Sequence, residues 1–165
     1  MTATFAFECY ADQDVVLVLR EECQLPLQKR HSFGQGEVIN DLLRNDRAEI
    51  GMVDEDPLSS HHPLRDTMHV EEVTPDVEHR RRSKKHLIIL KPELEECFIR
   101  SMRRAGVDLT VAGNAKDLQK VLNIPNHPKH AEFRQQLRDL RQAAETKHVP
   151  TFITDLERIV RASLT

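Results

Sequence analysis

Residues 50–57 read Ile50-Gly51-Met52-Val53-Asp54-Glu55-Asp56-Pro57, an apolar run that ends in two aspartates and a proline. The apolar half is typical of a buried β-strand, and the aspartates follow its carboxyl end. Ligands of open α/β sheets bind at that edge. Two carboxylates so close together repel each other unless a cation lies between them, and hard oxygen ligands suit Mg²⁺ or Mn²⁺. The alternative is an acidic turn, because aspartate is a common turn residue.

The chain before this stretch alternates between strand and helix patterns. The expected segments are strands at 4–9, 27–33 and 48–53 and helices at 13–24 and 37–44. Such an alternation with short connections predicts parallel strands joined by helical crossovers. Asp12 is expected to cap the first helix. If the first and third strands are neighbours, Glu8, Asp54 and Asp56 converge at one edge of the sheet.

The chain after Pro57 continues with strands and then with helices alone. Residues 67–73 are expected to form a strand, and residues 87–90, the most hydrophobic run, suit a central strand. Pro92 suits the first position of the helix that follows. Further helices are expected at 115–122, 132–145 and 150–163. We therefore expect an α/β fold with a small, mostly parallel sheet flanked by helices over residues 1–113, and a helical extension over 114–165 packed on or beside it.

Composition excludes several classes of protein. The net charge is −3, so no overall field attracts nucleic acid, and any such contact must come from a local patch. The chain has six Phe, one Tyr and no Trp, which argues against a base-stacking surface as the main binding device. Three scattered cysteines form no C-x-x-C pair, so neither a disulfide framework nor a cysteine zinc site is indicated. We read no membrane span and no signal peptide. A reducing, cytoplasmic setting fits best.

The acidic residues form a series that resembles the Toprim domain, the small α/β metal-binding module of topoisomerases, DnaG-type primases and OLD-type nucleases. The series consists of Glu8 at the end of the first strand, Asp12 four positions later, and Asp54-x-Asp56 after a later strand. The opening is similar to the V-E-G-x-x-D opening of many Toprim proteins, although Cys9 stands where they usually have glycine. Residues 91–99 resemble a segment of uncharacterised bacterial Toprim-like proteins related to the OLD nucleases. The likeness covers residues 4–104.

This resemblance implies a nuclease, that is, divalent-metal-dependent phosphodiester hydrolysis on nucleic acid, with Mg²⁺ or Mn²⁺ as cofactor. Glu8 would be a ligand or the general base, and Lys91 would offset the negative charge that develops on the phosphate. The metal ligands would be Asp12, Asp54, Asp56 and Glu95. A dication polarises a phosphoryl oxygen and lowers the pKa of the attacking water, and two ions about 4 Å apart stabilise the entering and leaving oxygens.

A basic run at residues 79–86 is the candidate contact with nucleic acid. It is either a solvated turn or a set of cations for flanking phosphates. The cations concerned are Arg80, Arg81, Arg82, Lys84 and Lys85. The implied partner is DNA or RNA, and the likeness to OLD-type nucleases leaves a partner ATPase open.

Two other classes of function stay open. A receiver domain, which accepts a phosphoryl group on an aspartate, has five parallel strands, an aspartate after the third strand and Lys-Pro after the fifth, as Asp54 and Lys91-Pro92 would supply. An inactive interaction module would carry the same acids as solvated turns and helix N-terminal charges. Two weaker patterns are Gly34-Gln35-Gly36, which could cradle a phosphate before a helix, and the adjacent pair His61-His62 as metal ligands.

Overall fold

The computed structural model describes residues 1–56 and 62–165. The strands are β1 (Ala3–Phe7), β2 (Leu27–His31), β3 (Ile50–Asp54), β4 (His69–Val73), β5 (Val77–Arg82) and β6 (Lys85–Leu90). The helices are α1 (Tyr10–Glu22), α2 (Gln35–Leu43), the 3₁₀ helix η1 (Pro63–Thr67), α3 (Leu94–Ala105), α4 (Ala115–Leu122), α5 (Lys129–Lys147) and α6 (Phe152–Ser163). Within the two described ranges, no helix has both the length and the apolar character needed to cross a bilayer.

The six strands form one mixed sheet in the order β2-β1-β3-β6-β5-β4. The first four in this order are parallel, whereas β5 and β4 run antiparallel to their neighbours. The expectation of an α/β fold with a mostly parallel sheet is therefore confirmed. Because β1 lies beside β3, with Phe7 opposite Met52, the residues that follow both strands leave the sheet at the same edge.

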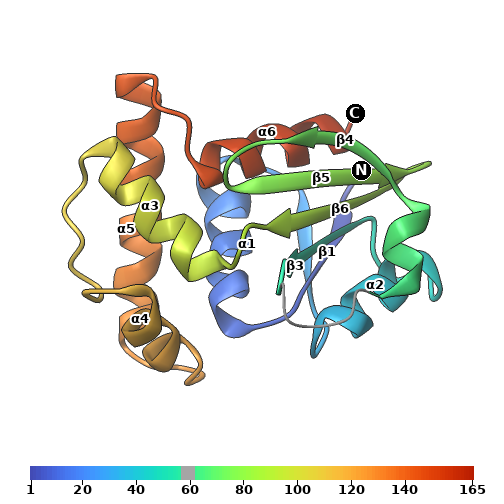
Figure 1. The fold of residues 1–165 in the computed structure, drawn as a ribbon, viewed down its shortest axis with the longest axis horizontal. Helices are drawn as coiled ribbons and strands as arrows, with labels where there is room; N and C mark the ends of the chain where they lie inside the picture. Colours follow the sequence, from blue (N-terminus) through green and yellow to red (C-terminus); the bar gives the residue numbers. More distant parts are fainter. Residues whose placement is uncertain (57–61) are drawn as a thin grey trace.

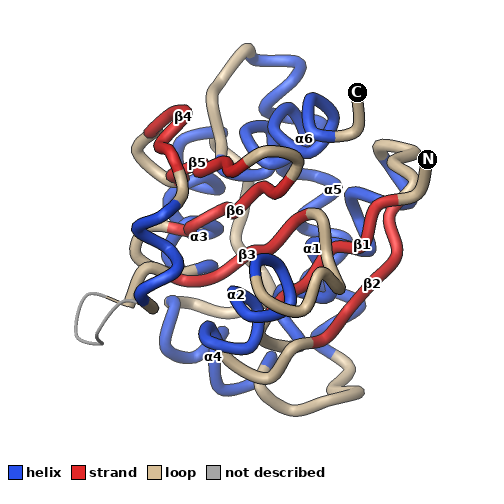
Figure 2. The backbone as a smooth tube through the Cα atoms, turned by 90° about the vertical axis from the view of Figure 1, so that its right-hand side faces the viewer, coloured by secondary structure: helices blue, strands red, loops and turns tan. Residues whose placement is uncertain are grey.

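Helix α2 covers one face of the sheet, and the other α-helices gather on the opposite face (Figures 1 and 2). The alternation of side chains along β3 explains this division: Val53 packs with α2, whereas Ile50 and Met52 pack with the larger helical layer. The C-terminal helices share this core, since the ring of Phe133 in α5 meets the ring of Phe98 in α3 edge to face, with centroids 4.9 Å apart.

The basic run is not a loop, and this part of the sequence analysis was wrong. Residues 77–82 form β5, residues 85–90 form β6, and the turn of this hairpin falls at Ser83 and Lys84. Only Val77 and His79 of β5 are buried, so the strand shows too few apolar positions to be recognised by alternation. Residues 107–112 contain no helix or strand and connect α3 to α4.

Two expected helix starts also differ from the structure. Helix α1 begins at Tyr10 with Cys9 as its N-cap, so Asp12 lies inside the first turn and is not the cap. Helix α3 begins at Leu94 with Glu93 as its N-cap, so Pro92 precedes the helix. Asp12 therefore lies in the first turn of α1, and Glu95 lies in the first turn of α3. Both helices begin at the edge of the sheet where β1 and β3 end.

Gly51 allows α2 to lie close against β3. A Cβ atom at this position would be 2.9 Å from Cγ1 of Val38 in α2. We expect Gly51→Ala to lower the free energy of unfolding by about 1–3 kcal/mol, because a packed core resists added volume. Urea unfolding measures the change. Gly113→Ala is the matched control, since a Cβ there meets no atom within 4 Å; equal stability of the two variants would contradict the prediction.

Candidate functional site

Four carboxylates meet at the carboxyl edge of the parallel strands, and we call them the acid cluster. They are Glu8, Asp12, Asp54 and Glu95. Glu8 follows β1 and Asp54 ends β3, while Asp12 and Glu95 come from the first turns of α1 and α3. The neighbouring positions of β1 and β3 in the sheet bring these segments together, as the alternation of strands and helices predicted.

Glu8 and Asp54 are in direct contact through the backbone. The N–H of Asp54 donates to Oε1 of Glu8 at 2.9 Å, across 46 positions of sequence. The N–H of Leu94 in turn donates to Oδ1 of Asp54 at 3.0 Å, which ties the start of α3 to the end of β3. Each carboxylate thus accepts one backbone hydrogen bond from a neighbouring segment.

Asp12 is the most deeply buried member of the acid cluster, with 2% of its surface exposed. Its Oδ2 accepts hydrogen bonds from the N–H groups of Glu8 and Cys9 at 3.2 and 3.1 Å. Its Oδ1 is buried and accepts no hydrogen bond. A buried oxygen of this kind costs free energy unless a proton or a cation satisfies it.

No cation balances the acid cluster within the described part of the chain. None of its four members forms an ion pair with a lysine, arginine or histidine there. Burial, followed by repulsion from the other carboxylates, raises the pKa of Asp54 to about 9 and that of Asp12 to about 7. Burial and then Glu93 and Glu96 raise the pKa of Glu95 to about 7.

The pKa of Glu8 is also raised, and here the nearby charge is that of Asp56. Burial raises its pKa first, and the nearby charge of Asp56 raises it further, while the hydrogen bond from Asp54 acts in the opposite direction. In the absence of a cation, Asp12, Asp54 and Glu95 therefore retain protons near neutral pH. Several carboxyl groups with raised pKa values in one place are typical of functional sites, because burying them together lowers the stability of the fold.

The side chains are not already arranged around a single point. Among the residues that the structure describes, no group of three or more His, Cys, Asp or Glu side chains is placed to hold a metal ion. Oxygen donors of the right chemistry are present, but Glu8 and Asp54 are turned toward backbone N–H groups. An ion could be held only if these side chains exchanged those hydrogen bonds for the ion.

Two further predicted site residues, Asp56 and Lys91, follow strands at the edge that carries the acid cluster. Asp56 follows β3 and acts electrostatically on Glu8. Lys91 follows β6 at the same edge, but it forms no ion pair with the acid cluster in the described part of the chain. Its position is compatible with contact to a bound phosphate, which stays a prediction.

The basic run lies at the other end of the sheet. Lys85 begins β6, and Leu90, opposite Asp54, ends it, so the hairpin turn and the acid cluster are at opposite edges. Four cations of the run already have partners. Arg80 contacts Glu78 and Asp66, and Lys85 donates to the carbonyl of Ala48. Arg81 donates to the carbonyl of Ser83, and Arg82 donates to the hydroxyl of Thr67. The structure therefore separates the basic run from the acids with which we expected it to share a substrate.

Three residues that the sequence analysis did not select also belong to this edge. The ring of His31, at the end of β2, donates through Nε2 to the carbonyl of Glu8 at 2.9 Å. Gln35 donates through Nε2 to the carbonyl of Asp54 at 2.7 Å. Phe33 stacks on His31. The rule that led to Asp54, namely that functional groups follow parallel strands, would also have selected His31 after the second strand.

The two weaker sequence patterns lie at the starts of helices. Gly34 is the N-cap of α2 and has a φ of 106°, a backbone conformation that favours glycine. The hydrogen bond from the side chain of Gln35 to the carbonyl of Asp54 places the start of α2 beside the end of β3. His62 accepts a hydrogen bond at Nδ1 from the N–H of Leu64 and caps η1. His61 lies outside the described residues. Phosphate binding by the glycine turn stays a prediction.

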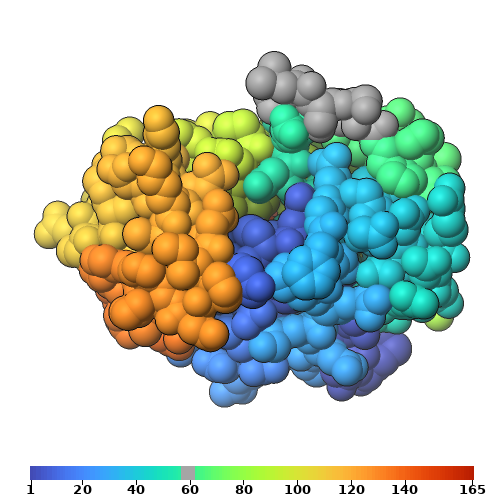
Figure 3. All heavy atoms as spheres, turned by 90° about the horizontal axis from the view of Figure 1, so that it is seen from below, coloured from blue at the N-terminus to red at the C-terminus, as the bar shows by residue number. Residues whose placement is uncertain are grey.

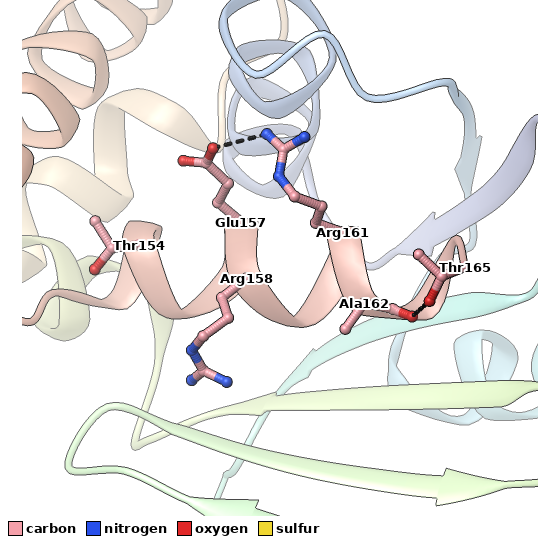
Figure 4. A pocket seen from close by; sticks show the side chains of 6 residues that line it. All are labelled: Thr154, Glu157, Arg158, Arg161, Ala162 and Thr165. Atoms are coloured by element: carbon pink, nitrogen blue, oxygen red, sulfur yellow. Dashed lines mark hydrogen bonds and ion pairs between the residues drawn. The ribbon is translucent and has the colours of Figure 1, made fainter.

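A hollow on α6 is a poorer candidate. It has a volume of about 440 Å³ and is lined by the six residues in Figure 4. Its charged side chains already have partners, since Glu157 pairs with Arg141 and Arg161, and Arg158 pairs with Glu72. These ion pairs leave little free charge to recognise a ligand.

Comparison of the chain with protein-family models, with curated proteins and with solved structures finds no significant match. The Toprim resemblance therefore stays a prediction from the sequence motifs.

Proposed function

We propose that this protein carries out phosphodiester hydrolysis on nucleic acid with Mg²⁺ or Mn²⁺ as cofactor. The observation that carries the proposal is the acid cluster at the carboxyl edge of the parallel strands. Its four carboxylates form no ion pair with a cation in the described ranges 1–56 and 62–165, and Oδ1 of Asp12 is buried and unsatisfied there. Carboxylate oxygens are the donors that both ions prefer. A cation bound at the unsatisfied oxygen of Asp12 would offset the cost of burying it.

The residues of the acid cluster have separate tasks in this proposal. A dication, when bound, polarises a phosphoryl oxygen and lowers the pKa of water. Asp12, Asp54 and Glu95, together with Asp56, supply oxygen ligands. Glu8 would take a proton from the attacking water, and its raised pKa makes it a stronger base than an ordinary carboxylate.

The wider setting follows from the same proposal. The substrate is DNA or RNA, Lys91 contacts its phosphate, and a separate ATPase could be a partner. Cys9, Cys23 and Cys97 are free thiols, which fits the reducing cytoplasm. Burial together with Asp12, Glu95 and Asp54 raises the pKa of the Cys9 thiol, so Cys9 stays protonated and is a poor competing ligand.

The receiver alternative has less support. It requires five adjacent parallel strands, whereas here only β2, β1, β3 and β6 pair in parallel, and β5 runs opposite to both of its neighbours, β6 and β4. The interaction module has one observation in its favour, since no group of acids in the described residues is yet arranged around an ion. Metal binding separates this alternative from the nuclease.

Calorimetric titration with Mn²⁺ tests the proposal. We expect saturable binding that releases protons, because the carboxyls retain protons near neutral pH and must lose them to bind an ion. Titration at pH 7 in two buffers with different ionisation enthalpies counts the released protons. Asp54→Ala should abolish binding, and Asp139→Asn, which alters an exposed carboxylate of α5, should leave it unchanged.

Cleavage assays on single- and double-stranded substrates follow for the metal-binding protein. Binding without proton release, or equal binding by Asp54→Ala, would place the ion elsewhere on the surface. Absence of binding at millimolar Mn²⁺ would overturn the nuclease proposal and leave the interaction module.

A further inference from the structure

Phe33 is an aromatic side chain left in solvent at the edge of the sheet that carries the acid cluster. It lies in the loop between β2 and α2, and 77% of its surface is exposed. A single exposed apolar side chain is common on protein surfaces and needs no explanation by itself. Its neighbours and its position are what set it apart.

The ring of Phe33 is held from behind by a stack of rings. It lies on the ring of His31, with centroids 4.3 Å apart and planes at 29°. His31 stacks in turn on Phe7, at 5.3 Å, and receives the edge of Tyr10 at 5.0 Å. The hydrogen bond from His31 to the carbonyl of Glu8 fixes the middle ring of the stack. One face of Phe33 is therefore supported, and its high exposure leaves the other face open.

The loop that carries Phe33 is tied to the acid cluster on both sides. His31, two residues before it, bonds to the carbonyl of Glu8, and Gln35, two residues after it, bonds to the carbonyl of Asp54. The N–H of Ser32 also donates to the carbonyl of Phe7 at 2.8 Å. Phe33 is thus placed at the rim of the acid cluster by contacts with the same two strand ends.

A hollow adjoins the ring stack on its other side. Figure 3 shows the blue N-terminal segment as the floor of a depression between the orange segment of α4 and α5 and the light-blue segment that includes α2. A cavity of about 550 Å³ lies between α1 and the start of α5, and Tyr10, His127 and Arg134 are among its lining residues. Tyr10 lines the cavity and also belongs to the ring stack, so a linear polymer bound at the ring stack could extend into the cavity.

We propose that Phe33, supported by His31, stacks on an unpaired base of a single-stranded nucleic acid whose backbone phosphate lies at the acid cluster. This inference rests on the proposed function and names its substrate class. An open aromatic face next to a phosphodiester site fits a base and its adjoining phosphate. Bases in a duplex are stacked on each other and cannot reach it, whereas unpaired bases stack on aromatic side chains without sequence preference.

The test uses oligonucleotides that carry 2-aminopurine, with Ca²⁺ in place of Mn²⁺ so that binding is measured without turnover. Fluorescence anisotropy gives the affinity for single-stranded and duplex forms. Phe33→Ala should weaken single-strand binding about 10- to 100-fold, the range of one lost base–aromatic stack. Val73→Ala, another exposed apolar side chain on β4, is the matched control and should leave affinity unchanged.

A second variant reports the stack directly. Because the chain has no tryptophan, Phe33→Trp introduces a single indole whose emission should be quenched by the single-stranded oligonucleotide and not by the duplex. Unchanged affinity of Phe33→Ala, or unchanged emission of Phe33→Trp at saturating oligonucleotide, would overturn the inference. Equal preference for duplex would overturn it as well.

Failure of this inference and failure of the proposed function give different results. If the wild type and Phe33→Ala both bind Mn²⁺ and cleave with equal efficiency, the base stack is wrong and the nuclease stands. If single strands bind through Phe33 while Mn²⁺ does not bind, the stack stands and the metal-dependent chemistry is wrong.

Discussion

Asp54→Asn is expected to make the metal-free protein more stable at pH 8, although it removes a residue of the candidate site. The largely buried position of Asp54, followed by repulsion from Asp12, Glu95 and Glu8, raises its pKa to about 9. In the unfolded chain an aspartate has a pKa of about 3.9. Folding at pH 8 must therefore either keep a proton on Asp54 or bury another negative charge. Asparagine removes that cost and keeps an oxygen acceptor for the N–H of Leu94.

The size of the effect follows from the shift in pKa. One pKa unit corresponds to about 1.36 kcal/mol. Because Asp54 is only partly shielded from solvent and shares its field with three other carboxyls, we expect a gain of about 2–4 kcal/mol at pH 8. For a chain of this length the melting temperature should rise by about 5–10 °C.

The pH dependence has a definite sign. A group whose pKa is raised on folding contributes stability that is fully present below its unfolded pKa and is lost as pH rises through its folded pKa. For Asp54 this loss runs from about pH 4 to about pH 9, and Asp12 and Glu95, with pKa values of about 7, add to it up to about pH 7. Asp54→Asn should therefore flatten the melting curve between pH 5 and pH 9, with its largest gain at the alkaline end.

Thermal melts with and without Mn²⁺ complete this experiment. Mn²⁺ should raise the melting temperature of the wild type and leave that of Asp54→Asn unchanged, because a ligand stabilises only the protein that binds it. Asp139→Asn, on the exposed side of α5, should behave as the wild type in every condition. A variant Asp54→Asn that is less stable than the wild type at pH 8 would show that its carboxylate has a partner that stabilises it.

The contrast between Asp54 and Phe33 shows how much of the site sequence patterns could predict. An apolar run followed by carboxylates marks a strand end, and strand–helix alternation brings such ends to one edge, so Glu8 and Asp54 could be placed together. The exposure of Phe33 depends on where β2 stops. The sequence suggested a strand through Phe33, whereas β2 ends at His31 and leaves the ring outside the core.

Long-range pairing explains the remaining differences. Residues 79–86 looked like a solvated turn because five of the eight are arginine or lysine, but hydrogen bonds to β6 hold residues 77–82 as a strand. Ion pairs then accommodate the charges, as between Arg80 and Glu78. Local patterns of hydrophobicity do not contain this information, because β-strand preference depends on the neighbouring strand.

Phe133→Ala is expected to lower the free energy of unfolding by about 3–5 kcal/mol, the usual cost of a large cavity in a packed core. Phe133 is fully buried in α5 against Phe98 of α3. The single tyrosine, Tyr10, begins α1 and reports the N-terminal part of the chain. Because α5 shares one hydrophobic cluster with α1, α3 and the sheet, the unfolding transitions followed by tyrosine fluorescence and by circular dichroism should shift together.

The matched control for Phe133→Ala is Phe33→Ala, the same substitution at an exposed ring, which should change stability by less than about 0.5 kcal/mol. Separate transitions in Phe133→Ala, with the tyrosine signal unmoved, would show that residues 114–165 unfold as an independent extension. Coincident transitions would mean that the C-terminal helices hold α1 and α3 in place. The first turns of those two helices supply Asp12 and Glu95, so loss of α5 packing would then also weaken binding of Mn²⁺.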